Sequence, residues 1–460
     1  MKKTLSLILA VLFALFASGC GEQAAKEAKT TIPPAQSRSD EYRLVTSGCV
    51  MPKMAMCVVL VDFADIACTT DEDEWADKCF GYEDSLRTFC QSASKKKLDI
   101  VPAAERYGAD DGVVHVTLAE DHPSTVQLDD DDFTHRLVNR VLHAADRYID
   151  VSAYDRNGDG VLWSTEFTPL IVLAGYEQDF EEYANDPSVG AHMHFTDEDG
   201  ASLSLDGVSD DVYIMIGELV YDYVRNENLL NSLEIIAHET GHALGLPDLY
   251  DTDDSSLGAG IHSTMGGCIY QDRSGKINED PVELDSWSKL FLGFVQAQVV
   301  TQAGEYTLYD DYTGLGNILL IPTQDPNEFF LLENRQFVHY DTVLADYMER
   351  GGISIWHINS RMIERNIYNV DGFVNVSAVN DDEDRKGVDL EEANEALLGY
   401  AQLDRHEEER YSKYDHYFSE NDTFGPDTQP SSALTDGRAT GITVRVLSDG
   451  LASKVEIDFE

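Results

Sequence analysis

The stretch that most constrains this chain is residues 231–251, "NSLEIIAHETGHALGLPDLYD". It places two histidines and a glutamate, His238, Glu239 and His242, inside a run of apolar residues. Polar side chains buried without partners cost free energy. We therefore expect a fold in which this buried helix brings its three polar side chains to a common site.

The boundaries of this helix can be predicted from its flanking residues. Asn231 can cap its amino end, and Glu234 three residues later completes a capping-box pattern. Gly245 is a typical stop residue, and Pro247 prevents the helix from continuing.

The spacing within the helix predicts a metal site. His238 and His242 are four residues apart and so project from the same face, where two imidazoles can bind one Zn²⁺. Glu239 lies beside them as a general base for a zinc-activated water. Gly245 lets the chain reverse and brings Asp248 within reach as the third ligand, while a downstream carboxylate or histidine is the competing candidate.

A second glycine-rich segment follows, "GIHSTMGGCIY" (260–270), with Met265 in a tight turn. It is similar to the methionine turn that underlies the zinc in metzincin proteases. The alternative is simple packing of a methionine beside glycines. His262 is close to this turn in sequence and could face the cleft, but no pattern fixes its role.

These motifs together resemble the immune inhibitor A family of secreted bacterial metalloproteases. The likeness is carried by "HETGHALGLPDLYD", "STMGG" and "DPVELDSWSKLFLGFVQ", and it extends upstream to "YDRNGDGVLWSTEFTPLIVLAGYEQ" and downstream to "EFFLLENRQ", "GGISIWHIN" and "FGPDTQPSSALTDGRATGITVRVL". It implies a zinc endopeptidase with a metzincin-like catalytic domain and a β-rich tail. By position, the resemblance implies that His238, His242 and Asp248 are the zinc ligands. It also implies that Glu239 is the general base and that Met265 lies in the methionine turn.

Residues 155–166, "DRNGDGVLWSTE", follow the pattern of an EF-hand calcium loop, with oxygen ligands at alternate positions and a glycine for the sharp turn. We expect a structural Ca²⁺ ion in a loop between a helix and a strand. An acidic turn without metal is the alternative. The predicted ligands are Asp155, Asn157, Asp159, the carbonyl of Val161, and Glu166.

The amino-terminal segment "MKKTLSLILAVLFALFASGC" predicts export. Its apolar run is short for a membrane span, and it ends in small residues and Cys20, as a bacterial lipobox does. We expect a lipoprotein signal over 1–19, acylation of Cys20, and a tether over 20–45. Ala17 stands where lipoboxes usually carry leucine, so ordinary secretory cleavage is the alternative, and little room is left before the first strand for a folded pro-segment.

Six further cysteines in an exported protein predict disulfides. Cys68 with Cys79 is the candidate for a local bridge, and Cys268 either pairs with one of the earlier cysteines or stays buried. The six are Cys49, Cys57, Cys68, Cys79, Cys90 and Cys268.

Hydrophobic patterning predicts an α+β protein. Residues 54–65 and 168–175 read as buried strands and 133–149 as an amphipathic helix, whereas the chain from about Gln302 onward shows short β-rich runs. We expect a metzincin-like mixed α/β catalytic domain over 46–298 and a mainly β, sandwich-like domain over 299–460. In the β region, Glu333 with Arg335 is expected to form an ion pair, and His357 to be a core histidine; a metal or substrate role is the alternative.

The formal net charge of −52, from 85 acidic and 33 basic residues, argues against nucleic acid and anionic membrane surfaces as partners. Acidic runs such as residues 380–387 are expected to be solvated loops. We expect a monomeric, lipid-anchored or secreted zinc metalloendopeptidase of the bacterial cell envelope that cleaves proteins or peptides. The alternatives are a non-catalytic surface lipoprotein that retains the fold for binding, and an enzyme acting on a non-protein amide or glycan-linked substrate.

Overall fold

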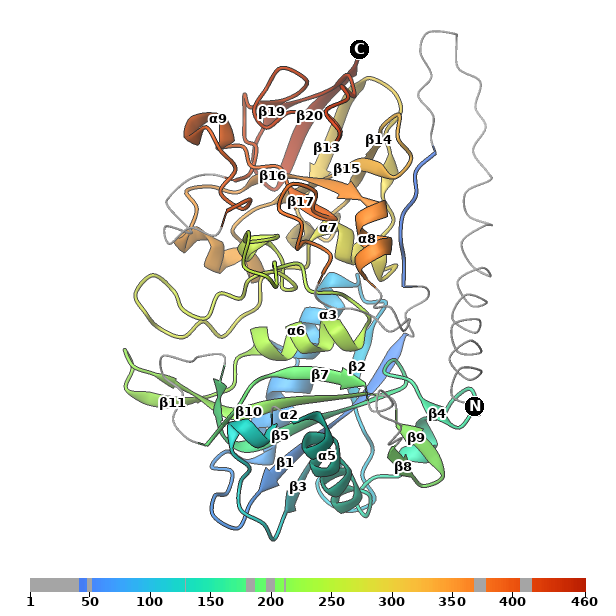
Figure 1. Cartoon of the computed structure of the whole chain (residues 1–460), viewed down its shortest axis with the longest axis vertical. Coiled ribbons are helices and arrows are strands. Elements are labelled where there is room, and N and C mark those ends of the chain that lie inside the picture. The colour runs from blue at the N-terminus through green and yellow to red at the C-terminus, as the bar shows by residue number, and fades with distance from the viewer. Residues whose placement is uncertain are drawn as a thin grey trace. The chain divides into compact units, whose positions relative to one another are not determined.

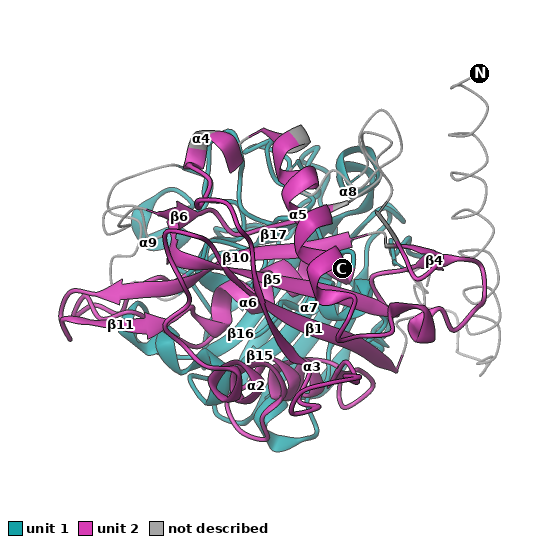
Figure 2. Ribbon diagram, turned by 90° about the horizontal axis from the view of Figure 1, so that it is seen from below, with its two compact units in different colours: residues 1–49, 245–268, 282–460 teal, residues 50–244, 269–281 magenta. Residues whose placement is uncertain are grey.

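The computed structural model describes residues 41–47, 52–128, 130–178, 187–195, 203–210, 212–367, 378–405 and 416–460. The predicted signal, most of the predicted tether, Cys20 and Cys49 lie outside these residues. The chain forms two compact units, one of residues 1–49, 245–268 and 282–460, the other of residues 50–244 and 269–281 (Figure 2). The predicted boundary between residues 298 and 299 stays a prediction.

The unit built on residues 50–244 is centred on an eight-stranded, mainly parallel sheet (Figure 1). The central strand β1 (Lys53–Asp62) runs parallel to β2, β3 and β5, and β10 runs parallel to β5. The predicted strands at 54–65 and 168–175 are confirmed as β1 and β5, which are buried almost throughout, as parallel strands covered on both faces are. The remaining strands of the sheet are β2 (Asp99–Pro102), β3 (Val113–Thr117), β5 (Phe167–Glu177), β6 (Ser188–Val189), β7 (His192–Phe195), β10 (Val212–Asp222) and β11 (Glu227–Leu230).

Helices pack on both faces of this sheet (Figure 1). The predicted helix at 133–149 is confirmed as α5 (Asp131–Ala145), which buries Leu137, Val141 and Ala145 at helical spacing in one hydrophobic cluster with residues of β1, β3 and β5. On the other face lie α3 (Leu86–Ala93) and α6 (Leu233–Ala243). The unit also contains α2 (Glu72–Phe80), α4 (Thr125–Leu128), the 3₁₀ turn η2 (Val151–Tyr154), and a small sheet of β4 (Val161–Leu162), β8 (Leu203–Leu205) and β9 (Val208–Asp210).

The other unit holds two sheets that bury one shared hydrophobic cluster. One sheet has the order β12-β14-β15-β16-β17 and the other β13-β20-β19-β18. The strands are β12 (Gln298–Val299), β13 (Gly304–Tyr309), β14 (Leu319–Pro322), β15 (Glu328–Arg335), β16 (Gly352–Asn359), β17 (Val388–Leu390), β18 (Thr423–Phe424), β19 (Ile442–Ser448) and β20 (Ala452–Phe459). The β-rich runs predicted after residue 302 are therefore confirmed as strands.

Short helical segments connect the strands of this unit. They are η4 (Gly260–His262), α7 (Ser286–Phe291), η5 (Asp311–Thr313), η6 (His339–Asp346), α8 (Ser360–Asn366) and α9 (Glu395–Leu398). The fold is a mixed α/β one, in keeping with the predicted α+β class. The metzincin-like character and a separate carboxy-terminal β domain stay predictions.

Residues 41–47, which include the end of the predicted tether, contact the unit that contains them. The backbone N–H of Arg43 donates to the carbonyl of Pro326 at 2.6 Å, and its guanidinium pairs with Glu364 at 2.5 Å. The N–H of Ser47 donates to the carbonyl of Phe291 at 3.0 Å.

The prediction of a Cys68–Cys79 disulfide is wrong, because both are free thiols, as are Cys57 and Cys90. Cys79 and Cys90 are buried on α2 and α3, where each packs as a small apolar side chain. Burial raises the pKa of each of these two thiols to about 12, which leaves them protonated and unreactive.

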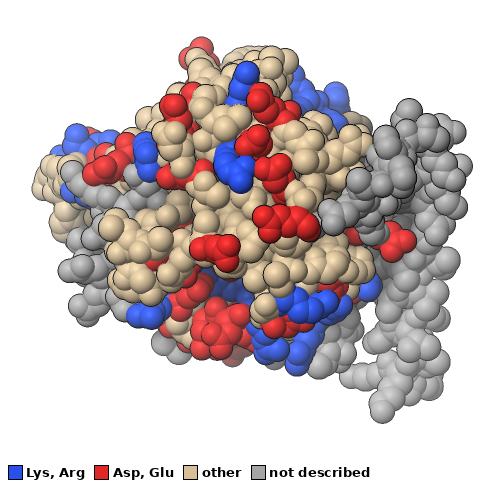
Figure 3. Space-filling view, turned by 90° about the horizontal axis from the view of Figure 1, so that it is seen from above, with Lys and Arg blue, Asp and Glu red and all other residues tan. Residues whose placement is uncertain are grey.

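Among the described residues, no helix combines the length and the apolar character that crossing a bilayer requires. On the face drawn in Figure 3, acidic side chains lie beside basic ones, with uncharged surface between them.

Candidate metal centre

Helix α6 begins one residue later than its sequence predicts. Ser232 is the N-cap, and its hydroxyl accepts the N–H of Ile235 at 3.3 Å. The prediction that Asn231 caps the helix is wrong, because its side-chain amide instead donates to Glu177 at 2.8 Å and to the carbonyl of Gly217 at 2.9 Å. Those partners belong to β5 and β10, so Asn231 ties the start of the helix to the sheet.

Glu234 does not complete a capping box either. Its buried carboxylate accepts the N–H of Ile269 at 2.8 Å and the amide of Asn278 at 3.3 Å. Burial raises the pKa of Glu234 to about 7. The side chain therefore joins the first turn of α6 to the segment 269–281 of the same unit.

The three predicted zinc ligands come together. The Nε2 atoms of His238 and His242 lie 3.1 Å apart, and a carboxylate oxygen of Asp248 lies within 4.8 Å of both ligand nitrogens. Two nitrogens on one tetrahedral Zn²⁺, at about 2.0–2.1 Å each, would be about 3.3 Å apart. The side chains are 6%, 6% and 3% exposed. Two nitrogens and one carboxylate oxygen, nearly buried and convergent, fit one zinc ion and leave a fourth position.

The turn after α6 confirms the role predicted for Gly245. The helix ends at Leu244, and Gly245 has a φ of +96°. Residues with a side chain are strained in this region of backbone conformation. The left-handed residue reverses the chain and carries Asp248 to the histidines.

Three hydrogen bonds hold the backbone of Leu249, the residue after Asp248. The N–H of Leu249 donates to the carbonyl of Met265 at 2.7 Å. The carbonyl of Leu249 accepts from the N–H of Ala259 at 2.7 Å and from the amide of Asn380 at 2.8 Å. Met265 is fully buried in a tight turn, as predicted, and its backbone carbonyl holds the segment that carries Asp248. Its place beneath a zinc ion stays a prediction.

Asn380 is a positioning residue that the sequence did not reveal. Its fully buried amide also donates to the carbonyl of Val388 at 3.0 Å, and its side-chain oxygen accepts the N–H groups of Gly387 and Val388. The prediction that residues 380–387 form a solvated loop is wrong at Asn380 and at Lys386, which is also buried. An asparagine at the start of an acidic run carries no sequence signal of this role.

Glu239 lies on α6 directly after His238 and is 6% exposed. It thus follows the first histidine in the same buried turn of helix, where the sequence pattern places the general base.

The predicted calcium loop, residues 155–166, lies between η2 and β5 and contains the short strand β4. Asp155 accepts the N–H groups of Gly158 at 2.7 Å and Gly160 at 3.0 Å, and Asp159 accepts that of Val161 at 2.8 Å. The buried Glu166 accepts the N–H of Arg156, and Asn157 donates to Asp159. These oxygens bond to the loop's own backbone, so the loop is folded by its ligand residues, and a calcium ion stays a proposal.

The charged residues singled out in the β region have other partners than predicted. Glu333 pairs with the buried Lys289 at 2.7 Å, and Arg335 pairs with Asp341 at 2.5 Å. The predicted ion pair between Glu333 and Arg335 is therefore wrong: each binds a residue from a different segment.

Two histidines outside the metal centre lie in buried polar clusters. His357 lies in the core, as predicted, between Glu328 at 3.2 Å and Glu391 at 3.3 Å. His262 is fully buried, with its ring nitrogens 2.9 Å from the hydroxyl of Tyr417 and 2.7 Å from His416. Its side chain is therefore used in packing within its own unit.

Comparisons with known proteins bear on the region that contains α6. Residues 135–299 match the family described as immune inhibitor A peptidase M6, catalytic domain. Over these residues the chain is similar to the immune inhibitor A peptidases. The matched M6 region contains His238, Glu239, His242, Asp248 and Met265, so the resemblance drawn from the motifs is confirmed.

A curated relative is the extracellular small neutral protease of Streptomyces caespitosus, 31% identical over 99 residues. The match covers 22% of this chain and 62% of that protease, so the chain spans less than two thirds of its relative's length. Two solved structures of OgpA from Akkermansia muciniphila match 72% and 70% of this chain, and 94% and 92% of their own. Their identities are 11% and 12% and both TM-scores are 0.28, which does not establish a common fold.

Proposed function

We propose that this chain is an exported zinc metallopeptidase that hydrolyses peptide bonds in proteins or peptides. One observation carries the proposal: two histidine nitrogens and a carboxylate converge in a buried site within the M6 region. His238, His242 and Asp248 would hold the ion, which when bound supplies Lewis acidity toward the scissile carbonyl and the attacking water.

The chain's own residues supply the proton transfers. Glu239 takes a proton from the attacking water as its oxygen bonds to the carbonyl carbon, and returns it to the amine as the carbon–nitrogen bond breaks. The near-burial of Glu239 excludes most bulk water from that carboxylate. Met265 and Asn380 act indirectly, since both hold Leu249 and so orient Asp248.

The test uses the full chain, loaded with zinc, and casein as substrate. Glu239→Gln should lower the rate of hydrolysis at least about 100-fold while zinc content stays unchanged, because general base catalysis contributes about 10²–10⁴-fold. Glu227→Gln, at an exposed carboxylate on β11, is the matched control and should keep full activity. Chelation should abolish activity and added zinc should restore it. A Glu239→Gln variant as active as the wild type would show that Glu239 is not the general base.

The same experiment separates the alternatives. A folded, zinc-loaded wild type that leaves casein intact but binds it would favour the non-catalytic surface lipoprotein. Activity on a non-protein amide alone would favour the second alternative.

We also propose a structural Ca²⁺ ion in the loop 155–166, supported by its ligand pattern and by the position of the buried Glu166. Calcium should raise the unfolding temperature of the wild type, and Asp159→Asn should reduce that rise. Acylation at Cys20, supported by the lipobox-like ending, would anchor the protein outside the cytoplasm. Metabolic labelling with a fatty acid should mark the wild type and leave Cys20→Ala unlabelled.

A further inference from the structure

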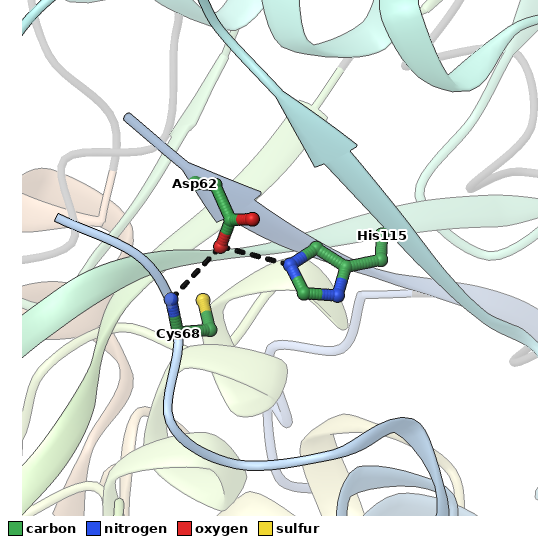
Figure 4. A group of neighbouring side chains, drawn as sticks. All are labelled: Asp62, Cys68 and His115. Atoms are coloured by element: carbon green, nitrogen blue, oxygen red, sulfur yellow. Dashed lines mark hydrogen bonds and ion pairs between the residues drawn. The ribbon is translucent and has the colours of Figure 1, made fainter. Parts of the chain in front are cut away.

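A second cluster of metal-ligating side chains lies outside the M6 region. Asp62, Cys68 and His115 each offer one ligand atom, and the three atoms lie within 4.8 Å of one another. Figure 4 shows the three side chains directed toward a common point. We propose that this cluster binds a zinc-class divalent ion, separately from the centre at His238 and His242.

The sheet positions two of the three side chains. Asp62 is the last residue of β1, and His115 lies on β3, which runs parallel to β1 with Leu60 opposite His115. Asp62 is two residues beyond Leu60 and so shares its face, which makes Asp62 and His115 diagonal neighbours. His115 Nε2 lies 2.9 Å from Asp62 Oδ1. Asp62 ends β1 and His115 lies two residues before the end of β3, so both are near the edge where open α/β sheets bind ligands.

The loop after β1 supplies the third side chain and is held in place. The N–H of Cys68 donates to Asp62 Oδ1 at 2.8 Å (Figure 4). The next two N–H groups, of Thr69 and Thr70, donate to one oxygen of Glu218 at 2.5 and 2.7 Å. Glu218 lies on β10 and is 1% exposed. The backbone that carries the thiol is thus held beside the sheet edge by contacts at Cys68 and at the two residues after it.

The donor set selects the class of ion. A thiolate, an imidazole and a carboxylate are ligands that zinc and similar transition metals take at 2.0–2.3 Å, whereas Ca²⁺ and Mg²⁺ take oxygen ligands. The side chains of His115 and Asp62 are 34% and 18% exposed, so an ion can enter from solvent. Three protein ligands leave one tetrahedral position for water or a further ligand.

Charge at the cluster favours a cation, because the carboxylates of Asp62 and Glu218 both accept backbone N–H groups of the segment that carries Cys68. A divalent ion would displace the thiol proton and offset the nearby carboxylates, with the imidazole proton on Nδ1 so that Nε2 faces the ion.

The test uses Co²⁺ as the probe, on the reduced, metal-free full chain carrying His238→Ala. This background weakens the nitrogen–oxygen centre, so the result does not depend on peptidase activity. We expect one equivalent of Co²⁺ to bind with the near-ultraviolet charge-transfer absorption of a cobalt–thiolate bond. Cys68→Ser should abolish that absorption, and Cys79→Ser, which removes a buried thiol on α2, should retain it.

A second variant keeps the test decisive if Cys68→Ser folds poorly. His115→Asn should weaken Co²⁺ binding at least about 10-fold, the lower limit for residues that support a metal. The matched control His143→Asn, at an exposed histidine on α5, should leave binding unchanged. The proposal is overturned if no thiolate absorption develops, or if it persists undiminished in Cys68→Ser.

Discussion

Adding one methyl group at Gly258 should disturb the candidate metal centre through the backbone. Gly258 has a φ of +57°, and a Cβ there would lie 2.2 Å from the carbonyl oxygen of Leu249 and 2.7 Å from the Cα of Tyr250. Leu249 directly follows the ligand Asp248. Gly258→Ala therefore forces the segment that carries Asp248 to move or the substituted turn to distort.

The cost has two parts. A residue other than glycine in the left-handed region costs about 1–2 kcal/mol. The overlap with Leu249 adds about 1–3 kcal/mol, typical of overpacking. The carbonyl must retreat by roughly 1 Å in a close-packed interior, although two hydrogen bonds hold it. We expect Gly258→Ala to lower the free energy of unfolding by about 2–5 kcal/mol.

Gly437→Ala separates the two parts. Gly437 has a φ of +81° with nothing within 4 Å of its would-be Cβ, so only the backbone cost of about 1–2 kcal/mol applies. Urea unfolding of both metal-free variants gives the difference. Chelator competition gives the zinc affinity, which should fall at least about 10-fold in Gly258→Ala and stay unchanged in Gly437→Ala.

The reasoning would be refuted if the two variants lost equal stability, since the overlap with Leu249 would then cost nothing. Equal zinc affinities with unequal stabilities would show that Leu249 can move without carrying Asp248.

Three further predictions concern buried polar groups. Asn380→Ala removes four buried hydrogen bonds and should lower the free energy of unfolding, measured in urea, by about 2–4 kcal/mol. The same substitution should also lower the affinity for zinc; an unchanged affinity would limit Asn380 to a stabilising role. Lys289→Met leaves buried carboxylates uncompensated and should destabilise by about 3–5 kcal/mol, whereas a neutral result would show that the cluster relaxes. Burial lowers the pKa of His357, but the neighbouring carboxylates of Glu328 and Glu391 have the larger effect and raise this pKa to about 9. Because the folded pKa exceeds the unfolded value of about 6.5, the contribution of His357 is complete below pH 6.5 and is lost toward pH 9. Urea midpoints should fall across this window in the wild type and less steeply in His357→Gln; parallel slopes would contradict the assignment.

Local chemistry is sufficient to predict much of the candidate centre. The four-residue spacing of His238 and His242 places both on one helix face, and Gly245 alone accounts for the reversal that brings Asp248 back. These are short-range effects, because helix geometry and backbone sterics act within a few residues. The strands β1, β5, β15 and β16 were predictable for the same reason: their apolar runs match the burial that such strands require.

The start of α6 shows where local reasoning fails. The sequence predicted Asn231 as the cap, but β5 and β10 present acceptors to its amide, and the next residue, Ser232, caps the helix instead. The sequence pattern likewise predicted a capping box for Glu234, but its carboxylate instead accepts hydrogen bonds from residues of the segment 269–281.

The helix that carries the histidines and the turn that follows it could be predicted from local sequence, because both depend on residues a few positions apart. The contact of Asn380 with Leu249, 131 residues away in sequence, and that of His115 with Asp62, 53 residues away, could be found only in the folded chain. Such contacts depend on strand register and chain crossings. Their side chains are ordinary polar residues until the fold brings their partners within hydrogen-bonding distance.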